Sequence, residues 1–500
     1  MKRLLGILLA GALPGMSAVE FDAIYGDGMV LQRGQKIVVR GKTDRPGEPV
    51  TVSFNGQTVK AMVKGTRWMA GLQPMEANAT GQELVASQES GSATVRNVVV
   101  GEVWIASGQS NMLWRLNQTP GGGQADIAQS SNEQLRFHHS EPMANPNPAP
   151  YSAEQIKRVT EKRLFEGRWA VSSPATSPRM SAVGYYFGQA LQRELKVPVG
   201  IIHASLGGSE MLAWIPRDRV NREFPCCRGA GWLESKYAGP WVRGRAKFNM
   251  GKADPTLHPY APAYLYETGI KPWERFPVAG VIWYQGESDA EVYDNAQNKK
   301  LLMTLIESWR EKLGNDELPF LQVQLPRIND KRPLRAHWPD FRQVQAEVAE
   351  EMPAVGCVVT LDLGSTNADV HPPRKVEVGE RLAATALSMV YGRDIVACGP
   401  EISRVRAWGG KLEVSFRNAA GLRTTDGAAP ACFEIAGADK KFRPAAGIIR
   451  GEKVILSAEG VRAPRYVRYG WATFVSPNLV NAAGLPAAPC STADARAKRS

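Results

Sequence analysis

Residues 101–116 read GEVWIASGQSNMLWRL, and this stretch predicts a short buried strand that runs directly into a helix. The apolar run Val103–Ala106 forms the strand, and small residues make the turn after it. Ser110 stands at that turn, two residues after Gly108. A serine there presents its hydroxyl at the carboxyl edge of a sheet, beside the unbonded N–H groups that begin the helix. This arrangement suits a nucleophile with an oxyanion site, although serine is also an ordinary helix N-cap.

From residue 99 onward, apolar strand-like runs alternate with amphipathic helical segments. This alternation predicts an α/β fold, in which helices cover both faces of a parallel sheet. Ligands in such folds bind outside the carboxyl ends of the strands, so the residues that follow each strand are the candidates for a functional site. The expected strands are 98–106, 199–204, 278–284, 320–325 and 355–361, and the expected helices are 181–195, 298–313, 341–351 and 374–391.

The chain on either side of this segment has a sequence pattern typical of β-strands. Short alternating runs separated by turn signals such as Asn55-Gly56 indicate a β-sandwich-like module before residue 99, and similar runs return after residue 399. Two stretches rich in Pro, Gly, Asn and Trp, 117–178 and 215–276, are expected to be long loops. The predicted organisation is a signal peptide at 1–18, β-rich regions at 19–98 and 399–485, a catalytic domain at 99–398 and a disordered tail at 486–500.

The amino terminus and the composition point to an exported protein. Lys2 and Arg3 precede the apolar run Leu4–Leu13, which has the pattern of a secretory signal peptide and is too short to span a bilayer. Export permits disulfides, but six cysteines in 500 residues do not make a disulfide scaffold. The formal net charge of +12 comes from scattered basic residues, which argues against nucleic-acid binding. No Cys/His spacing predicts a metal site, and no cofactor is expected.

Three further post-strand segments carry residues that suit a serine hydrolase. Gly207-Gly208 ends one strand and allows backbone N–H groups to approach a substrate oxygen. Gln285 follows another strand and offers a carboxamide donor to a developing oxyanion. Asp289, in the same turn, is expected to be a helix-capping or surface carboxylate. His371 precedes two prolines after a third strand, and histidine is the natural general base for serine. His203 is the rival base, but its position within a strand favours a core role.

These motifs resemble the SGNH hydrolase superfamily, and more closely the sialate O-acetylesterase family. The resemblance spans nearly the whole chain after residue 18. Its implied fold is a three-layer α/β/α, flavodoxin-like catalytic domain flanked by β modules. The matching segments are YGDGMVLQRG at 25–34, GEVWIASGQSNM at 101–112, SLGGS at 205–209, WYQGES at 283–288, DVHPPRK at 369–375, RYGWA at 468–472 and NAAGLP at 481–486.

The resemblance implies a role for each matching residue. Ser110 is the expected nucleophile and His371 the expected base. The Ser110 N–H, the Gly207 N–H and the Gln285 side chain form the expected oxyanion hole, with Gly208 as the alternative to Gly207.

The acid that orients His371 is not fixed by the resemblance. The superfamily usually places an aspartate three residues before the histidine, where this chain has Ala368. Asp369, two residues before His371, is the expected acid. Glu287, Asp362 or a backbone carbonyl are the alternatives.

The implied reaction is hydrolysis of an O-acetyl ester on a sugar, without a metal or an organic cofactor. Sialic acid acetylated at O9 is the expected substrate. Acetylated xylan or another polysaccharide is the first alternative, and an inactive glycan-binding module is the second. Tryptophans close to the motifs, such as Trp104, Trp114, Trp214 and Trp283, are expected mostly to pack in the core.

Overall fold

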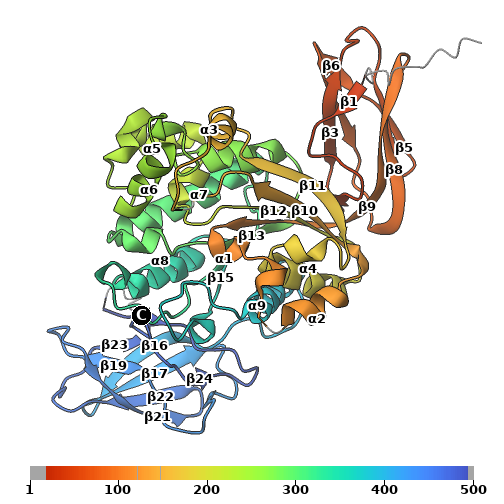
Figure 1. Cartoon of the computed structure of the whole chain (residues 1–500). Coiled ribbons are helices and arrows are strands. Elements are labelled where there is room, and N and C mark those ends of the chain that lie inside the picture. The colour runs from red at the N-terminus through yellow and green to blue at the C-terminus, as the bar shows by residue number, and fades with distance from the viewer. Residues whose placement is uncertain (1–18, 121, 147, 494–500) are drawn as a thin grey trace, which may run out of the picture.

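The computed structural model describes residues 19–120, 122–146 and 148–493. The predicted signal peptide at 1–18 lies outside the described residues. A central sheet organises the molecule (Figure 1), and its main path runs in the order β11-β10-β12-β9-β13-β14-β15. Neighbouring strands are parallel except for the antiparallel edge pair β10–β11. These strands are β9 (Gly91–Gly108), β10 (Asn132–Pro142), β11 (Phe165–Ser172), β12 (Val199–Ser205), β13 (Gly280–Tyr284), β14 (Phe320–Val323) and β15 (Val355–Val358).

Helices cover both faces of this sheet, which confirms the predicted α/β/α architecture. Val103 and Ile105 of β9 belong to the apolar core shared with α7 and α8. Trp104 and Ala106, which alternate with them, belong to the core shared with α4 and α9. Side chains alternate between the two faces of a strand, so both faces of β9 must be apolar. The covering helices are α4 (Ala182–Leu195), α7 (Asn295–Leu313), α8 (Trp338–Glu351) and α9 (Lys375–Met389).

The expectation that 117–178 forms a loop was wrong, because this stretch supplies β10 and β11. The sequence of β10 carries many polar residues, which hid its strand character. Arg136 is buried there, and its guanidinium donates to Gly28 O and to Asn97 O and Oδ1. These hydrogen bonds to residues distant in the sequence satisfy the donors of the buried guanidinium, and β10 alone could not supply such partners. The same stretch holds α2 (Gly122–Ala128) and α3 (Ala153–Thr160).

The second predicted loop, 215–276, folds mainly as short helices. They are α5 (Arg217–Glu223), α6 (Pro240–Met250) and several single turns. The short helical turns of the described chain are η1 (Leu116–Gln118), η2 (Ser177–Arg179), η3 (Met211–Trp214), η4 (Pro225–Cys227), η5 (Gly229–Leu233), η6 (Pro255–Leu257), the π-helical η7 (Tyr266–Ile270), η8 (Lys271–Trp273), η9 (Asp289–Glu291), η10 (Pro333–Arg335) and η11 (Leu361–Leu363).

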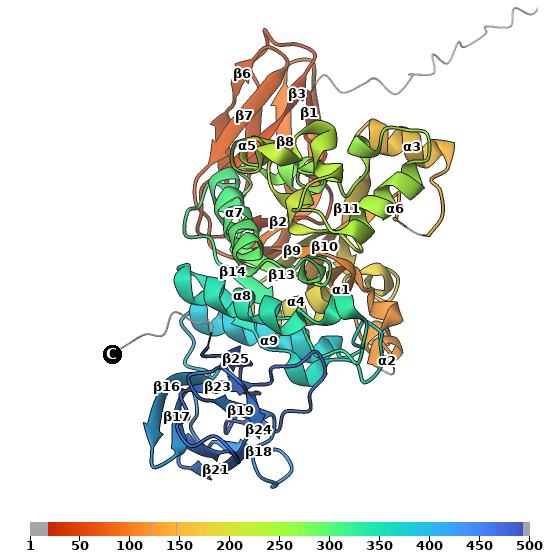
Figure 2. The ribbon, with the colours of Figure 1, turned by 90° about the vertical axis from the view of Figure 1, so that its left-hand side faces the viewer.

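The long strand β9 belongs to two parts of the molecule at once. Its first half pairs with β8, and its second half pairs with β12 and β13. The expected domain boundary at 98/99 therefore falls inside a continuous strand, and the division into domains remains a prediction. Figure 2 shows the amino-terminal strands on one side of the helical layers and the carboxyl-terminal strands on the other. The remaining amino-terminal strands are β1 (Val19–Phe21), β2 (Val30–Gln32), β3 (Ile37–Thr43), β4 (Thr51–Phe54), β5 (Gln57–Lys60), β6 (Met62–Lys64), β7 (Arg67–Leu72) and β8 (Asn78–Gln88).

The carboxyl-terminal region consists of small antiparallel sheets with their own apolar core. The buried Arg342 of α8 joins this region to the catalytic layers, since its guanidinium donates to Leu325 O, Pro326 O, Ala472 O and Thr473 O. The strands are β16 (Glu401–Trp408), β17 (Lys411–Arg417), β18 (Arg423–Thr424), β19 (Phe433–Ala436), β20 (Arg443–Pro444), β21 (Ala446–Arg450), β22 (Lys453–Ser457), β23 (Tyr466–Tyr469), β24 (Leu479–Val480) and β25 (Cys490–Ser491).

The prediction of a disordered tail was wrong for residues 486–493. Ala487 is fully buried, and β25 pairs with β23. Ser491 N also donates to Gln343 Oε1 of α8 at 3.2 Å. Apolar burial and sheet pairing fix this segment, although its Ala/Pro-rich sequence has no strand periodicity. Residues 494–500 lie outside the described part.

No helix within the described ranges is both long and apolar enough to cross a membrane.

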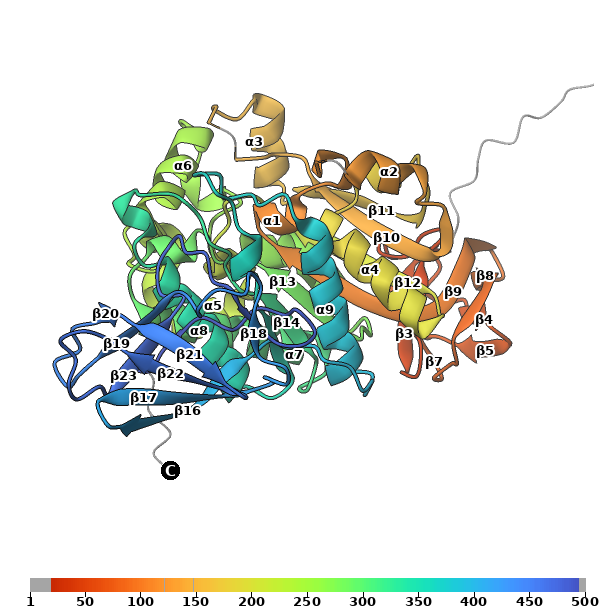
Figure 3. The same cartoon turned by 90° about the horizontal axis from the view of Figure 1, so that it is seen from below.

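Strand register brings three predicted site segments to one edge of the sheet. Gly108 of β9 lies level with Ser205 of β12 and Tyr284 of β13. The segments that follow these strands therefore leave the sheet side by side. The short helix α1 (Ser110–Leu113) begins at this edge, next to the upper ends of α4 and α9 as seen from below (Figure 3).

We predict that Gly108→Ala destabilises the protein by roughly 3 kcal/mol. Gly108 has φ +141°, and a Cβ there would lie 2.1 Å from Tyr284 O. Chemical denaturation followed by tryptophan fluorescence measures the effect. The matched control is Gly244→Ala on α6, where no atom lies within 4 Å and alanine should stabilise the helix by about 1 kcal/mol. An equal effect of the two substitutions would contradict the close approach.

Candidate active site

Ser110 is the first residue of α1, directly beyond β9. Its side chain is partly buried, and its own N–H makes no hydrogen bond within the described chain. The turn is fixed by Gln109, whose N–H donates to Tyr284 O at 3.0 Å. The Ser110 N–H is thus one of the orphan donors at a helix start, next to its own hydroxyl.

Gly207 lies against Ser110. A Cβ built on Gly207 would be 3.6 Å from Ser110 Cβ, and the Gly207 N–H makes no hydrogen bond to any described residue. Tyr260 Oη donates to Gly207 O at 2.7 Å, and Ser288 Oγ donates to Gly208 O at 3.1 Å. Both carbonyls therefore have partners, whereas the Ser110 and Gly207 N–H groups have none among the described residues.

His371 lies in the loop before α9. Its Nδ1 is 3.0 Å from Asp369 Oδ1, which also accepts the His371 backbone N–H at 2.9 Å. The imidazole stacks on Trp114, with ring centroids 5.3 Å apart and an interplanar angle of 27°. With Nδ1 turned to Asp369, Nε2 is the nitrogen left to exchange a proton. No hydrogen bond joins His371 to the Ser110 hydroxyl among the described residues.

The two alternative acids have other partners. Asp362 forms a two-bond ion pair with Arg381 at 2.7 and 2.8 Å. Glu287 is buried and accepts a hydrogen bond from Asn111. Neither carboxylate is hydrogen-bonded to the histidine.

Asn111 links the serine segment to the histidine loop. Its Nδ2 donates to the Glu287 carboxylate and, at 2.9 Å, to Val370 O. Its Oδ1 accepts a hydrogen bond from Lys375 Nζ, the first residue of α9. One carboxamide therefore joins the segments that carry Ser110, Gln285 and His371. The roles of Asn111 and Lys375 cannot be read from the sequence, because a single buried polar side chain leaves no periodic signal along the chain.

The charges around Asn111 are strongly perturbed by burial. Burial lowers the pKa of Lys375 to about 7, although the Glu287 and Asp369 carboxylates act in the opposite direction. Burial also raises the pKa of Glu287, against the hydrogen bond from Asn111. The Lys375 ammonium lies 5.5 Å from the ring centroids of both Trp114 and Tyr284. Aromatic faces and one amide thus replace water around this cation.

Gln285 is buried directly after β13. Its Nε2 donates to Ser209 O at 3.1 Å and to the Asp289 carboxylate, while its Oε1 is buried without a partner. Asp289 also accepts the Met211 N–H. The sequence favoured a surface or capping role for Asp289, and this was wrong: the carboxylate is 3% exposed. Burial raises its pKa to about 7.

The neighbouring histidines and tryptophans have core roles, as expected. His203 is fully buried in β12 and stacks on His139, and burial lowers the pKa of both. Trp104, Trp214 and Trp283 are also buried.

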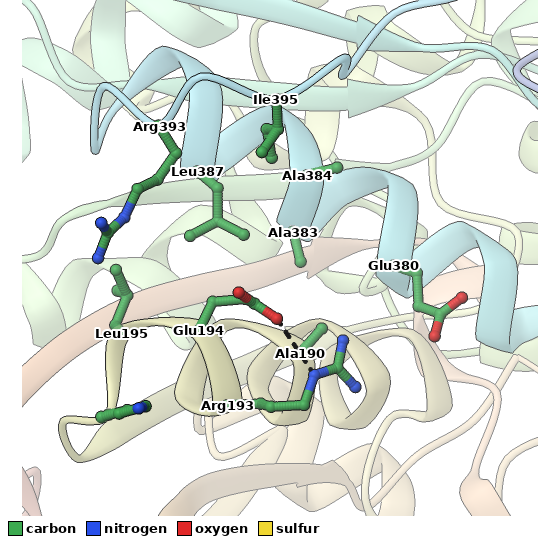
Figure 4. Close-up of a pocket in the computed structure, with 11 residues that line it drawn as sticks. Ala190, Arg193, Glu194, Leu195, Glu380, Ala383, Ala384, Leu387, Arg393 and Ile395 are labelled. Carbon is green, nitrogen blue, oxygen red and sulfur yellow. Dashed lines mark hydrogen bonds and ion pairs between the residues drawn. The ribbon is translucent and has the colours of Figure 1, made fainter. Parts of the chain in front are cut away.

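A separate cavity of about 710 Å³ lies between the carboxyl-terminal halves of α4 and α9 (Figure 4). Ala190 and Leu387 form part of its wall, together with Arg193 and Glu380. The opposite ends of these two helices, at Ser181 and Lys375, face the Ser110 segment. This cavity is therefore not part of the candidate active site.

Comparison with known proteins identifies the family. Residues 255–388 match a family model described as carbohydrate esterase, sialic acid-specific acetylesterase. The sialate O-acetylesterase of Pongo abelii is 26% identical over 496 residues, covering 91% of this chain and 88% of that protein. The sialate O-acetylesterase of Mus musculus is 26% identical over 420 residues, 76% and 75% of the two chains.

A solved structure is similar over almost the whole chain. The crystal structure of a carbohydrate acetylesterase from Xanthomonas citri is 33% identical, covers 95% of this chain and 99% of its own, and superimposes with a TM-score of 0.79. Together with the three-layer fold and the motifs gathered at its edge, this similarity shows that the chain belongs to the sialate O-acetylesterase family of carbohydrate esterases and is a carboxylic ester hydrolase.

Proposed function

We propose that this protein removes O-acetyl groups from sugars through Ser110 and His371, by way of an acetyl-enzyme. The observation that carries the proposal is the placement of His371. Asp369 holds its Nδ1, and Trp114, which follows Ser110 by one helical turn, stacks on its ring. A histidine held in this manner beside a helix-start serine is suited to act as general base.

The proposed reaction proceeds in two halves. His371 Nε2 takes the Ser110 proton as Ser110 Oγ attacks the carbonyl carbon of the acetyl group. The carbonyl oxygen then becomes the oxyanion of a tetrahedral intermediate. His371 returns that proton to the sugar oxygen, the C–O bond breaks, and the deacetylated sugar leaves. Water, activated by the same histidine, then releases acetate and restores Ser110.

The Ser110 and Gly207 N–H groups are the proposed oxyanion donors. Both lack hydrogen-bond partners within the described chain, and Gly207 packs against Ser110. Donors that are free before reaction do not have to break other bonds as charge develops.

Gln285 is the proposed third donor, held in place by Asp289. Both hydrogens of the Gln285 amide already form hydrogen bonds. To donate to an oxyanion, Gln285 must therefore break one of these bonds, such as the bond to Ser209 O. Protonation of Asp289 weakens the second hydrogen bond, which runs from Gln285 Nε2 to the Asp289 carboxylate. The buried carboxyl is therefore a part of this site whose charge should depend on pH near neutrality.

The proposed substrate is sialic acid acetylated at O9. The mammalian relatives that cover most of the chain are named sialate O-acetylesterases, whereas the solved relative is named only as a carbohydrate acetylesterase. Acetylated xylo-oligosaccharides are the competing substrates in the tests below. We also propose that the protein is exported, on the pattern of residues 1–18.

We expect Ser110→Ala to lower acetate release from 4-nitrophenyl acetate at least about 1,000-fold, because the nucleophile is lost. Enzymatic detection of acetate measures the rate, and Ser403→Ala on the exposed strand β16 is the control. If the folded wild type released nothing from any acetyl ester, the esterase proposal would be replaced by the glycan-binding alternative.

We expect Asp369→Ala to lower kcat about 10- to 100-fold with little change in KM, because His371 loses the group that fixes its tautomer. The side chain of Asp369 is 54% exposed, so the loss should be smaller than for a buried acid. Glu377→Gln, which removes a carboxylate early in α9, is the control for steady-state kinetics. A near-normal kcat would reject Asp369 and direct attention to Glu287 or Asp362.

We expect the free energy of unfolding of the wild type to fall as pH rises from about 4 to about 7, and we expect Asp289→Asn to abolish this dependence on pH. The folded-state pKa is raised to about 7, so the folded protein binds more protons than the unfolded chain in this window, and the free energy of unfolding falls as pH rises. Relative to the wild type, the variant should gain roughly 2–4 kcal/mol across the window. Denaturant titrations at several pH values measure this gain, and parallel curves for the two proteins would contradict it.

A further inference from the structure

We infer that the exposed indole of Trp241 is a sugar-binding platform beside Ser110, which positions a pyranose ring of the acetylated glycan; this inference rests on the proposed function. Trp241 lies in the first turn of α6, within a segment that the sequence predicted to be a loop. It is 44% exposed. Neither its position near the site nor its exposure could be read from the sequence.

The indole lies directly against the turn that carries the proposed oxyanion donor. A Cβ at Gly208 would be 2.6 Å from Trp241 Cη2 and 2.4 Å from Tyr260 Oη. Gly208 also has φ +70°, where a side chain is strained. The space that a side chain at 208 would fill is therefore occupied by the edge of the indole. Gly207, the next residue along the chain, packs against Ser110. The indole and the proposed nucleophile therefore contact neighbouring residues of the same turn.

The ring is held rigidly, as a binding platform requires. The Gly239 N–H donates to the buried Glu210 carboxylate at 2.7 Å, which ties the start of α6 to the segment after Gly207-Gly208. The Arg245 guanidinium lies 5.3 Å from the centre of the indole ring, and the Tyr260 ring lies 6.0 Å from it at 38°. A ring that is fixed before binding loses little conformational entropy when a ligand packs on it.

Exposure of Trp241 contrasts with the burial of most tryptophans in the described chain. Eight of the large aromatic side chains that are almost fully buried in the described chain are tryptophans: Trp68, Trp104, Trp214, Trp232, Trp273, Trp283, Trp309 and Trp338. Aromatic side chains that line a ligand site commonly bind the ligand through their faces, and Trp241 lies next to the proposed oxyanion donor. The C–H face of a sugar ring suits an indole, whose edge can stay wet while its face is covered.

Trp114 is the second indole near Ser110. It stacks on His371, whereas Trp241 lies against Gly208. Trp114 is already engaged with the catalytic histidine, which leaves Trp241 as the indole available to select the sugar.

The test compares ester hydrolysis with and without a sugar. For Trp241→Ala in the full chain, we expect the ratio of kcat/KM on an acetylated sugar to kcat/KM on 4-nitrophenyl acetate to fall about tenfold, mainly through KM. The sugar probes are 9-O-acetyl-N-acetylneuraminic acid and acetylated xylo-oligosaccharide. Trp241→Phe should keep the ratio within about threefold of wild type. Trp408→Ala, which removes a tryptophan 67% exposed on β16, is the matched control and should leave the ratio unchanged.

An unchanged ratio for Trp241→Ala would overturn the inference, whether both activities fell together or neither fell. A binding measurement separates this failure from failure of the proposed function. In the Ser110→Ala protein, calorimetric titration with each intact acetylated sugar should show binding that Trp241→Ala weakens about tenfold. Binding that is absent, or that is insensitive to Trp241, would refute the platform even if the wild type proved inactive as an esterase.

Discussion

The side-chain amide of Asn111 is the contact on which the arrangement of this site depends. It accepts from the buried Lys375 ammonium and donates to the buried Glu287 carboxylate and to Val370 O. An ammonium and a carboxylate buried without partners would each cost several kcal/mol. The amide gives each of them one hydrogen bond, and in doing so it links the segments that carry Ser110, Gln285 and His371.

The flanking β regions support the same edge of the sheet from outside. The strand β9, which ends two residues before Ser110, begins in the amino-terminal β region, so the serine segment is continuous with that region. Arg342 secures the carboxyl-terminal region to α8 through four backbone carbonyls, and burial lowers the pKa of this guanidinium to about 9. The proposed catalytic residues thus stand at the ends of strands and helices, and the helical segment 215–276 supplies Trp241.

Much of the fold was predictable because its signals are local. The apolar alternation in β9 and the amphipathic period of α4, α7, α8 and α9 place the catalytic layers within a few residues of their observed bounds. The misses have a common cause. β10 carries a buried Arg136, and β25 follows an Ala/Pro-rich stretch, so each becomes a strand only through partners distant in the sequence. Asp289 was assigned to the surface for the same reason, since nothing in its neighbourhood along the chain shows that Met211 and Gln285 enclose it.

The fold class and the strand-end positions of Ser110, Gly207, Gln285 and His371 can be read along the chain, because strand periods, helix periods and turn residues are local signals. The partners of these residues depend on packing. In the folded chain Asp369 lies on His371 Nδ1 and Asp362 on Arg381, and the Ser110 and Gly207 N–H groups have no partner among the described residues. Packing also brings Trp241 against Gly208 from a helix some thirty residues away. Burial and hydrogen-bond partners are properties of the packed chain, so no pattern along the sequence can specify them.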